Sequence, residues 1–263
     1  MARHEASFFT AVSTMCYRQV KCFLRMRSRV IMSFVRPFMW LFFFGVGWAA
    51  SIRGDFVRTS LGGMSFMDFM AVGVTMMAVF FTSFFAGSSV IWDREFGLLK
   101  ETLVSPASRK AIILGRALGD SFAAMIQGTV TFAVAMLLME HVNMAGIPML
   151  ILVMLLTSIV HASMGSALGS LVNSVEAFQL INMTVAMPML FLSGAVVPLY
   201  TAPTWMRTLS LLIPLTYGVD AARASVSGIS MLPLWLDLTV LVGLAILLVI
   251  VSAKIFERAT VPV

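Results

Sequence analysis

Apolar residues gather in six long runs along this 263-residue chain, and most charged residues fall between the runs. Each run is about 20 residues or longer, the length that an α-helix needs to cross roughly 30 Å of hydrocarbon. The runs predict spans at about 30–51, 66–90, 112–139, 146–172, 178–199 and 234–253. The pattern therefore predicts an all-α polytopic membrane protein.

The residues before the first run follow a different pattern. Between positions 5 and 29, apolar residues recur at spacings of three and four. The interleaved basic residues are Arg18, Lys21, Arg25, Arg27 and Arg29. This arrangement is typical of an amphipathic helix at the cytoplasmic membrane surface, with its basic side on anionic headgroups. We expect two units: this interfacial helix within 1–29, and one six-span domain over 30–263.

Composition supports a lipid environment. The chain is 60% hydrophobic and 11% charged, whereas soluble domains carry about 25% charged residues. The net charge of +6 does not indicate nucleic-acid binding, because basic residues of membrane proteins mark the cytoplasmic side. Of the 18 Lys and Arg residues, only Arg53, Arg58, Arg207 and Arg223 fall on the other side of the predicted spans. Both termini are therefore predicted to be cytoplasmic.

The segment "IWDREFGLLKETLVSPASRK" at 91–110 brings mixed charges between the second and third spans. Phe96, Leu99 and Leu103 recur at spacings of three and four, which predicts a short amphipathic helix over about 94–104. Ser105 and Pro106 then fit an N-cap and first helical position for the third span. The mixed charges favour a protein partner; a solvated connector or a helix resting on lipid are the alternatives.

The segment between the last two spans is too apolar for a solvated loop. Pro198, Pro203 and Pro214 divide it into short pieces. Two short helices that dip into the outer leaflet, or that pack on the bundle, would fit. Irregular backbone at membrane depth is tolerated only where protein buries it or a cavity hydrates it. This makes 200–230 a candidate outer gate.

Two stretches carry a resemblance to a known family. "DREFGLLKETLVSPASRKAIILGRALGD" and "FLSGAVVPLY…W…L…IPLTYGVDAAR" resemble the two signatures of ABC-2 type transporter permeases, and the likeness covers nearly the whole chain. Among subtypes, the chain is most similar to drug, lipo-oligosaccharide and polysaccharide exporters of bacteria and archaea. The resemblance implies a permease subunit in the cytoplasmic (inner) membrane, which dimerises, binds separate ATPase subunits and exports an amphiphilic substrate.

The resemblance also implies roles for individual residues. A coupling helix within 94–106 would dock on the ATPase through Arg94, Glu95, Phe96, Gly97, Leu98, Leu99, Lys100, Glu101, Ser105 and Pro106. Spans two and five would line a substrate path at a dimer interface, through Met77, Phe80, Phe81, Phe84, Met183, Met187 and Phe191. The outer gate would use Pro198, Trp205, Pro214, Leu215, Tyr217, Asp220 and Arg223.

The chain contains no G-x-x-x-x-G-K-[ST] motif, the pattern that cradles nucleotide phosphates. The sequence also has no metal-ligand or nucleophile pattern, so we expect no enzymatic activity, cofactor or metal site in this chain. ATP and Mg²⁺ would be bound by the partner subunit.

Isolated polar residues within the spans leave other functions open. His161 and Glu176 are candidates for a functional role, since ionisable groups inside a membrane are costly. Arg116 could pair with Asp120, and Asp220 with Arg223, each within one helix. An ion-driven secondary transporter is an alternative function, although inverted repeats and midplane acidic residues are not evident. A membrane-embedded, lipid-modifying enzyme is a further alternative that lacks clustered catalytic residues.

Overall fold

The computed structural model describes residues 7–47, 59–98 and 108–259. These residues form an all-α structure, as predicted, and contain no β-strand. The α-helices in chain order are α1 (Phe8–Arg25), α2 (Arg27–Trp40), α5 (Phe66–Phe85), α6 (Ser88–Glu95), α8 (Arg109–Met136), α9 (Ile147–Leu171), α10 (Val175–Leu192), α11 (Thr204–Ser210), α12 (Pro214–Ser227) and α13 (Leu234–Ala259). The same described residues also form the short helices η1 (Leu41–Val46), η2 (Met144–Gly146) and η3 (Leu199–Thr201).

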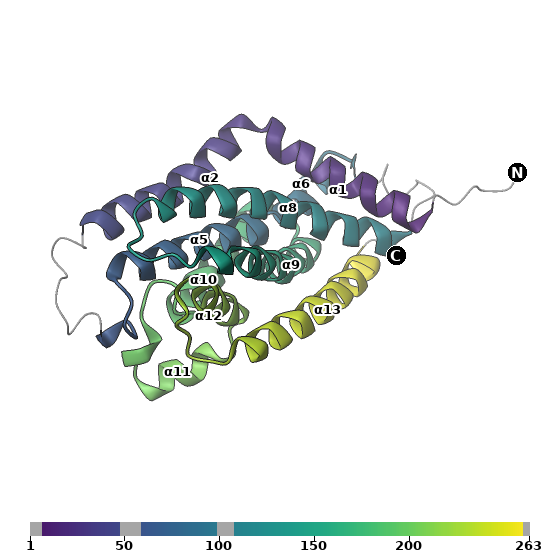
Figure 1. Cartoon of the computed structure of the whole chain (residues 1–263). Helices are drawn as coiled ribbons and strands as arrows, with labels where there is room; N and C mark the ends of the chain where they lie inside the picture. The colour runs from purple at the N-terminus through teal and green to yellow at the C-terminus, as the bar shows by residue number, and fades with distance from the viewer. Residues whose placement is uncertain (1–6, 48–58, 99–107, 260–263) are drawn as a thin grey trace, which may run out of the picture.

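Within the described residues, four stretches are long and apolar enough to cross a membrane: Phe66–Glu95, Met144–Leu171, Val175–Leu192 and Leu234–Ala259. Helix α1 and the helical stretch Val30–Val46 meet at an angle of 82° (Figure 1), and together they would make a fifth candidate span if they are counted as one broken span. The 28-residue helix α8 is long enough, but polar residues such as Arg116, Asp120 and Gln127 lower its hydropathy. The chain thus has several membrane-spanning helices, and the six-span topology stays a prediction.

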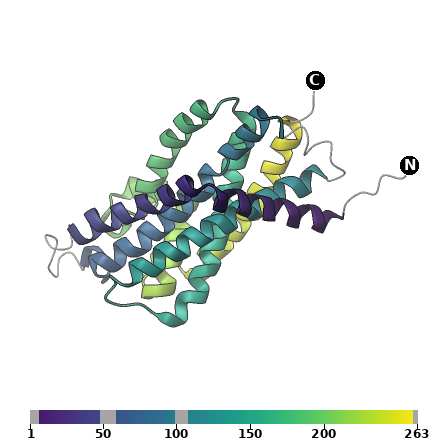
Figure 2. The same ribbon diagram turned by 90° about the horizontal axis from the view of Figure 1, so that it is seen from above.

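Helix α5 forms the centre of the bundle. Every residue from Asp68 to Phe80 is buried, because α2, α8, α9 and α12 all pack around it. In Figure 2, α1 and α2 run across the other helices. Of the most apolar 18-residue stretch in Phe66–Glu95, 83% is buried within the chain, against 28% for Val175–Leu192. Span five therefore has an apolar surface free for lipid or a partner, and span two does not.

Small residues bring the junction of α5 and α6 against α9. A Cβ at Gly165 would overlap the carbonyl oxygen of Phe84, and one at Gly87 would overlap that of Gly165. Small residues allow such close backbone contact between helices. Gly73 likewise contacts the backbone of Ala195. The small residues Gly73 and Gly87 of span two thus pack against backbone of the same chain.

Several helix boundaries differ from the predicted ones. Span five begins at Val175, where the Ser174 side chain accepts a hydrogen bond from the Ala177 amide, and ends at Leu192 before Gly194 (φ +83°). Proline lacks an N–H and clashes with the preceding turn, and α2, which contains Pro37, continues as the π-helix η1. The predicted N-cap at Ser105 is wrong for α8: Ser108 caps it by accepting from Ala111 N at 3.2 Å.

The N-terminal segment forms the predicted amphipathic helix over Phe8–Arg25. Its buried residues, Ala11, Met15, Gln19 and Phe23, recur every four positions on one face. That face packs on α8, where Gly115 and Gly119 allow the backbone of α1 to approach. The buried face of α1 is therefore covered by protein.

The segment between α10 and α13 contains short helices, as predicted. Pro203 precedes α11, and Pro214 occupies the first turn of α12, a position that tolerates proline because its N–H would lack a helical partner. Gly228 ends α12 in the left-handed conformation (φ +70°). Helix α12 packs on α5, α9 and α13, so this segment belongs to the bundle.

Candidate functional site

The first motif opens with an aspartate that joins three helices. Asp93, near the end of α6, accepts from Arg18 of α1 at 2.8 Å and from Arg116 of α8 at 2.5 Å. We call these three residues the Asp93 node. The Arg116 side chain is only 1% exposed, so its charge depends on a partner inside the protein. Arg116 therefore forms its ion pair with Asp93, rather than the predicted intrahelical pair with Asp120.

The next residue of the motif fixes the end of another helix. Arg94 donates to the carbonyl oxygens of Ser170 (3.0 Å) and Val172 (3.2 Å), and to Asn173 Oδ1 (3.2 Å). The last carbonyls of a helix have no partner within it, so Arg94 caps the C-terminus of α9. Arg94 was predicted to contact the ATPase, and the structure places its guanidinium on its own chain.

The chain turns sharply after α6. Phe96 ends the helix, and Gly97 adopts the left-handed conformation (φ +74°), which glycine tolerates best. A single helix from Arg94 to Val104 is therefore wrong, because Arg94 and Glu95 belong to α6. Glu95, Phe96 and Leu98 are exposed at this turn. The predicted coupling residues Leu99, Lys100, Glu101, Ser105 and Pro106 lie outside the described residues.

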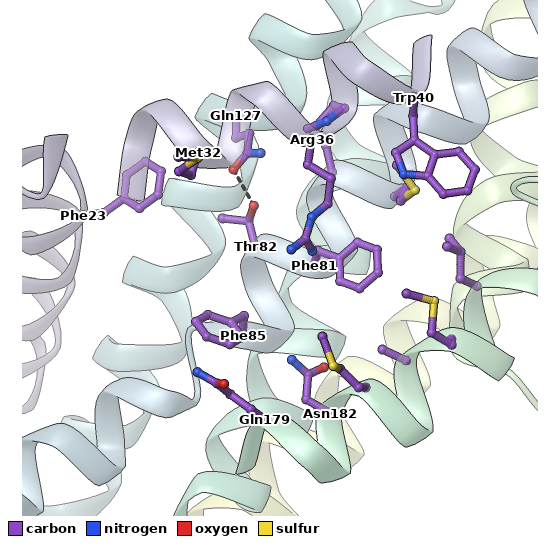
Figure 3. Close-up of a pocket in the computed structure, with 17 residues that line it drawn as sticks. Phe23, Met32, Arg36, Trp40, Phe81, Thr82, Phe85, Gln127, Gln179 and Asn182 are labelled. Atoms are coloured by element: carbon purple, nitrogen blue, oxygen red, sulfur yellow. Dashed lines mark hydrogen bonds between the residues drawn. The ribbon is translucent and has the colours of Figure 1, made fainter. Parts of the chain in front are cut away.

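A cavity of about 540 Å³ lies between α2, α5, α8 and α10. Its apolar walls include Trp40 at the end of α2, Met77 and Phe81 of α5, and Met183 and Met187 of α10. Its polar lining comes from Arg36, Thr82, Gln127, Gln179 and Asn182 (Figure 3). The volume falls within the range of about 300–1,000 Å³ that is typical of small-molecule sites.

Four of the predicted substrate-path residues line this cavity: Met77, Phe81, Met183 and Met187. Phe80 and Phe84 do not, because both are buried in the core and stack on each other with ring centroids 5.7 Å apart. Phe191 is 42% exposed on α10, away from the lining. The polar lining was missed, although Arg36 beside a proline in an apolar run was a visible signal.

Contacts within the chain or the position in a helix account for two further polar residues that were predicted within the spans. His161 is fully buried, bonds the Thr157 carbonyl through Nδ1 at 2.7 Å, and meets the Phe80 ring edge-on at 4.9 Å. Glu176 is exposed in the first turn of α10, where a carboxylate interacts favourably with the helix dipole. Among the described residues, no three His, Cys, Asp or Glu side chains are grouped as metal ligands.

The predicted gate residues differ in how far they are buried. Leu215 is fully buried, whereas Trp205 is 63% exposed. Pro198 precedes η3, and Pro214 begins α12. The Tyr217 hydroxyl donates to the Leu211 carbonyl at 2.7 Å, joining α12 to the end of α11.

Asp220 and Arg223 do not form the predicted pair, because each has partners of its own. Arg223 donates to the Gly194 carbonyl at 2.7 Å, and its guanidinium lies 3.8 Å from the centre of the Phe69 ring. Burial lowers the Arg223 pKa to about 10, so the side chain is still cationic at neutral pH. The Asp220 pKa is raised, chiefly by burial. Its carboxylate accepts from the backbone amides of Met231 and Leu232 at 2.8–3.0 Å.

We expect Asp220→Ala to destabilise the α12–α13 connection by about 1–3 kcal/mol, because it leaves two backbone N–H groups without their acceptor. Hydrogen exchange followed by mass spectrometry should show faster exchange at Met231 and Leu232. Asp220→Asn keeps one acceptor oxygen and should have a smaller effect. Unchanged exchange in Asp220→Ala would contradict this role.

Comparison with known proteins agrees with these features. The family model described as "ABC-2 type transporter" matches residues 10–226. A putative transport permease ycf38 of Pyropia yezoensis is 28% identical over 229 residues, covering 85% of this chain and 76% of the relative. The inner membrane transport permease YadH of Escherichia coli (strain K12) is 23% identical, covering 79% and 82%. Nodulation protein J of Rhizobium leguminosarum bv. viciae is 24% identical, covering 84% of each chain.

The family match spans most of the chain and includes both quoted motifs. The resemblance seen in the sequence is thereby confirmed, and the relatives are named as transport permeases rather than enzymes. With several helices long enough to cross a membrane, the chain belongs to the ABC-2 type transporter family as a multi-pass membrane subunit of a transporter.

Proposed function

We propose that the chain is the permease of an ATP-driven exporter, and that a separate ATPase docks on the segment 94–106. This proposal rests on the contacts that the end of α6 makes with other helices and on the exposed residues that follow it. Asp93 and Arg94 hold α6 to α1, α8 and α9, while Glu95, Phe96 and Leu98 are exposed beyond it. A force applied at this turn would therefore act on four helices together.

The proposed exporter is a dimer of permeases in the inner membrane of a prokaryote, with six spans and both termini in the cytoplasm. ATP and Mg²⁺ bind to the ATPase subunits. Exposed apolar residues on α10, such as Leu180 (70%) and Met183 (65%), support a role for span five in the dimer contact. ATP binding would then shift the permease between inward- and outward-facing states. The substrate is an amphiphile exported from the cytoplasm.

Phe96→Asp tests the docking site. Phe96 is 75% exposed, so the substitution leaves the fold intact but places a charge in the proposed apolar contact. We expect the tagged variant to insert normally and to lose the ATPase that co-purifies with the wild-type chain. Phe96→Leu keeps an apolar side chain and should retain it. Mass spectrometry and cross-linking from Leu98→Cys would identify the partner.

If Phe96→Asp retains the ATPase, the docking assignment is wrong. If the wild-type chain yields no P-loop protein with or without cross-linking, the ATP-driven mechanism itself is wrong.

A further inference from the structure

The cavity between α2 and α10 has a cationic group and no carboxylate among its described lining residues. The Arg36 guanidinium lies 5.1 Å from the centre of the Phe81 ring, a cation–π contact that orients the group. Arg36 has no Asp or Glu within ion-pair distance in the described part of the chain. In Figure 3, its side chain reaches from α2 toward Phe81 in the cavity. The available charge favours an anionic ligand.

A second polar group in the cavity lacks a partner. Asn182 of α10 is 7% exposed, and its Oδ1 atom has no hydrogen-bond partner among the described residues. Thr82 and Gln127 differ, because they bond each other between α5 and α8. A buried amide oxygen without a donor is costly, and Asn182 lines the cavity. A ligand carrying a hydroxyl group would supply the missing donor.

The remaining walls suit an alkyl chain. Met77, Met183 and Met187 bring flexible thioethers to the lining, and Trp40 and Phe85 bring aromatic surfaces. Methionine adapts to varied apolar shapes. The α10 side of the cavity meets the surface, where Met183 is 65% and Met187 43% exposed. An alkyl chain could therefore extend from the cavity along this exposed side of α10.

We propose that this cavity takes an amphiphile whose headgroup is anionic and carries a hydroxyl group. Arg36 binds the anion, Asn182 accepts from the hydroxyl, and the methionine wall holds the alkyl chain. This inference rests on the proposed export function, for which it specifies the substrate class.

Quenching of Trp40 provides a direct test. The full-length chain in phosphatidylcholine nanodiscs would be titrated with lysophosphatidylglycerol carrying a dibrominated chain, and separately with lysophosphatidylcholine carrying the same chain. The chain has five tryptophans, so the Trp40→Phe variant gives the background to subtract. We expect the anionic lipid to bind about 10-fold more tightly, since a charge-assisted hydrogen bond is among the stronger ones.

Matched variants assign the preference to the cavity. Arg36→Gln should bring the two lipids to equal affinity, whereas Arg36→Lys should keep part of the preference. Arg27→Gln is the control, because Arg27 is exposed on the same helix and does not line the cavity; it should change nothing. Asn182→Leu should weaken the binding of lysophosphatidylglycerol several-fold. Without ligand, this variant should be at least as heat-stable as the wild-type chain, because the unpaired amide is removed.

Equal affinity of the wild-type chain for the two lipids would overturn the inference, as would a full preference in Arg36→Gln. Displacement of the lipid by glycerol 1-phosphate at the same concentration would also overturn it, because a soluble anion would then be the ligand. The same preparation should be examined for its ATPase partner. If the ATPase co-purifies but the chain shows no preference for the anionic lipid, the export function stands and the substrate class is rejected. If the chain prefers the anionic lipid but no ATPase co-purifies, only the export mechanism is rejected.

Discussion

Asp93→Asn is expected to lower the free energy of unfolding by about 3 kcal/mol or more. The substitution keeps the shape of the side chain but removes its charge, so the buried Arg116 loses the carboxylate 2.5 Å from its Nη2 atom. Removing one member of a buried ion pair typically costs about 3–5 kcal/mol, because the other charge stays buried without compensation. Unfolding of the detergent-solubilised chain by heat or by sodium dodecyl sulphate would measure the loss.

Glu95→Gln is the matched control, since Glu95 is an exposed carboxylate two residues further along. It should change stability by no more than about 0.5 kcal/mol. The double variant Asp93→Asn/Arg116→Met should regain much of the stability, because removing both charges avoids the orphaned cation. Equal stability of Asp93→Asn and Glu95→Gln would show that the Asp93 node does not stabilise the fold.

Gly165→Ala is expected to destabilise the chain by about 3 kcal/mol, a large effect for one methyl group. The added Cβ would overlap the carbonyl oxygen of Phe84, and the nearby Gly87 backbone also contacts Gly165. Backbone atoms cannot move aside as a flexible side chain can, so α9 and the end of α5 would have to separate. The same unfolding assay would measure the change.

Gly243→Ala on α13 provides the comparison. A Cβ at Gly243 meets nothing within 4 Å, and alanine favours a helix over glycine by about 0.5–1 kcal/mol. This variant should therefore be neutral or more stable than the wild-type chain. If Gly165→Ala is as stable as Gly243→Ala, the close contact between α5 and α9 does not hold the bundle together.

These two sets of contacts also bear on transport. The glycines join α9 to the junction of α5 and α6, and the Asp93 node joins α6 to α1 and α8. The turn at Phe96 and Gly97 follows directly. A movement imposed on this turn would therefore be passed to helices that line the cavity, including α5 and α8. Such coupling requires that the packed helices can adopt two alternative arrangements. In the proposed exporter these are the inward- and outward-facing states.

The candidate site was only partly readable from the sequence. The family resemblance, which rests on local motifs, named Phe96 and three methionines of the cavity, Met77, Met183 and Met187, but it did not name Met32. The partners of Asp93, Arg94 and Arg223 were not anticipated. Each binds a residue or backbone group that is distant in sequence, such as Arg18, 75 positions from Asp93. A spacing of three or four predicts intrahelical pairs, and tertiary partners replaced them here.

The sequence by itself determined the class of this protein. Apolar runs of membrane length set the all-α architecture, and two motifs placed the chain in its family, because both properties are local patterns. Only the tertiary structure decided which faces are free. It buried span two around Phe80, left α10 exposed, and brought Arg36 and Asn182 to one cavity. The physical reason is that helical periodicity gives each helix an apolar face, while the helix that covers this face depends on contacts between distant segments.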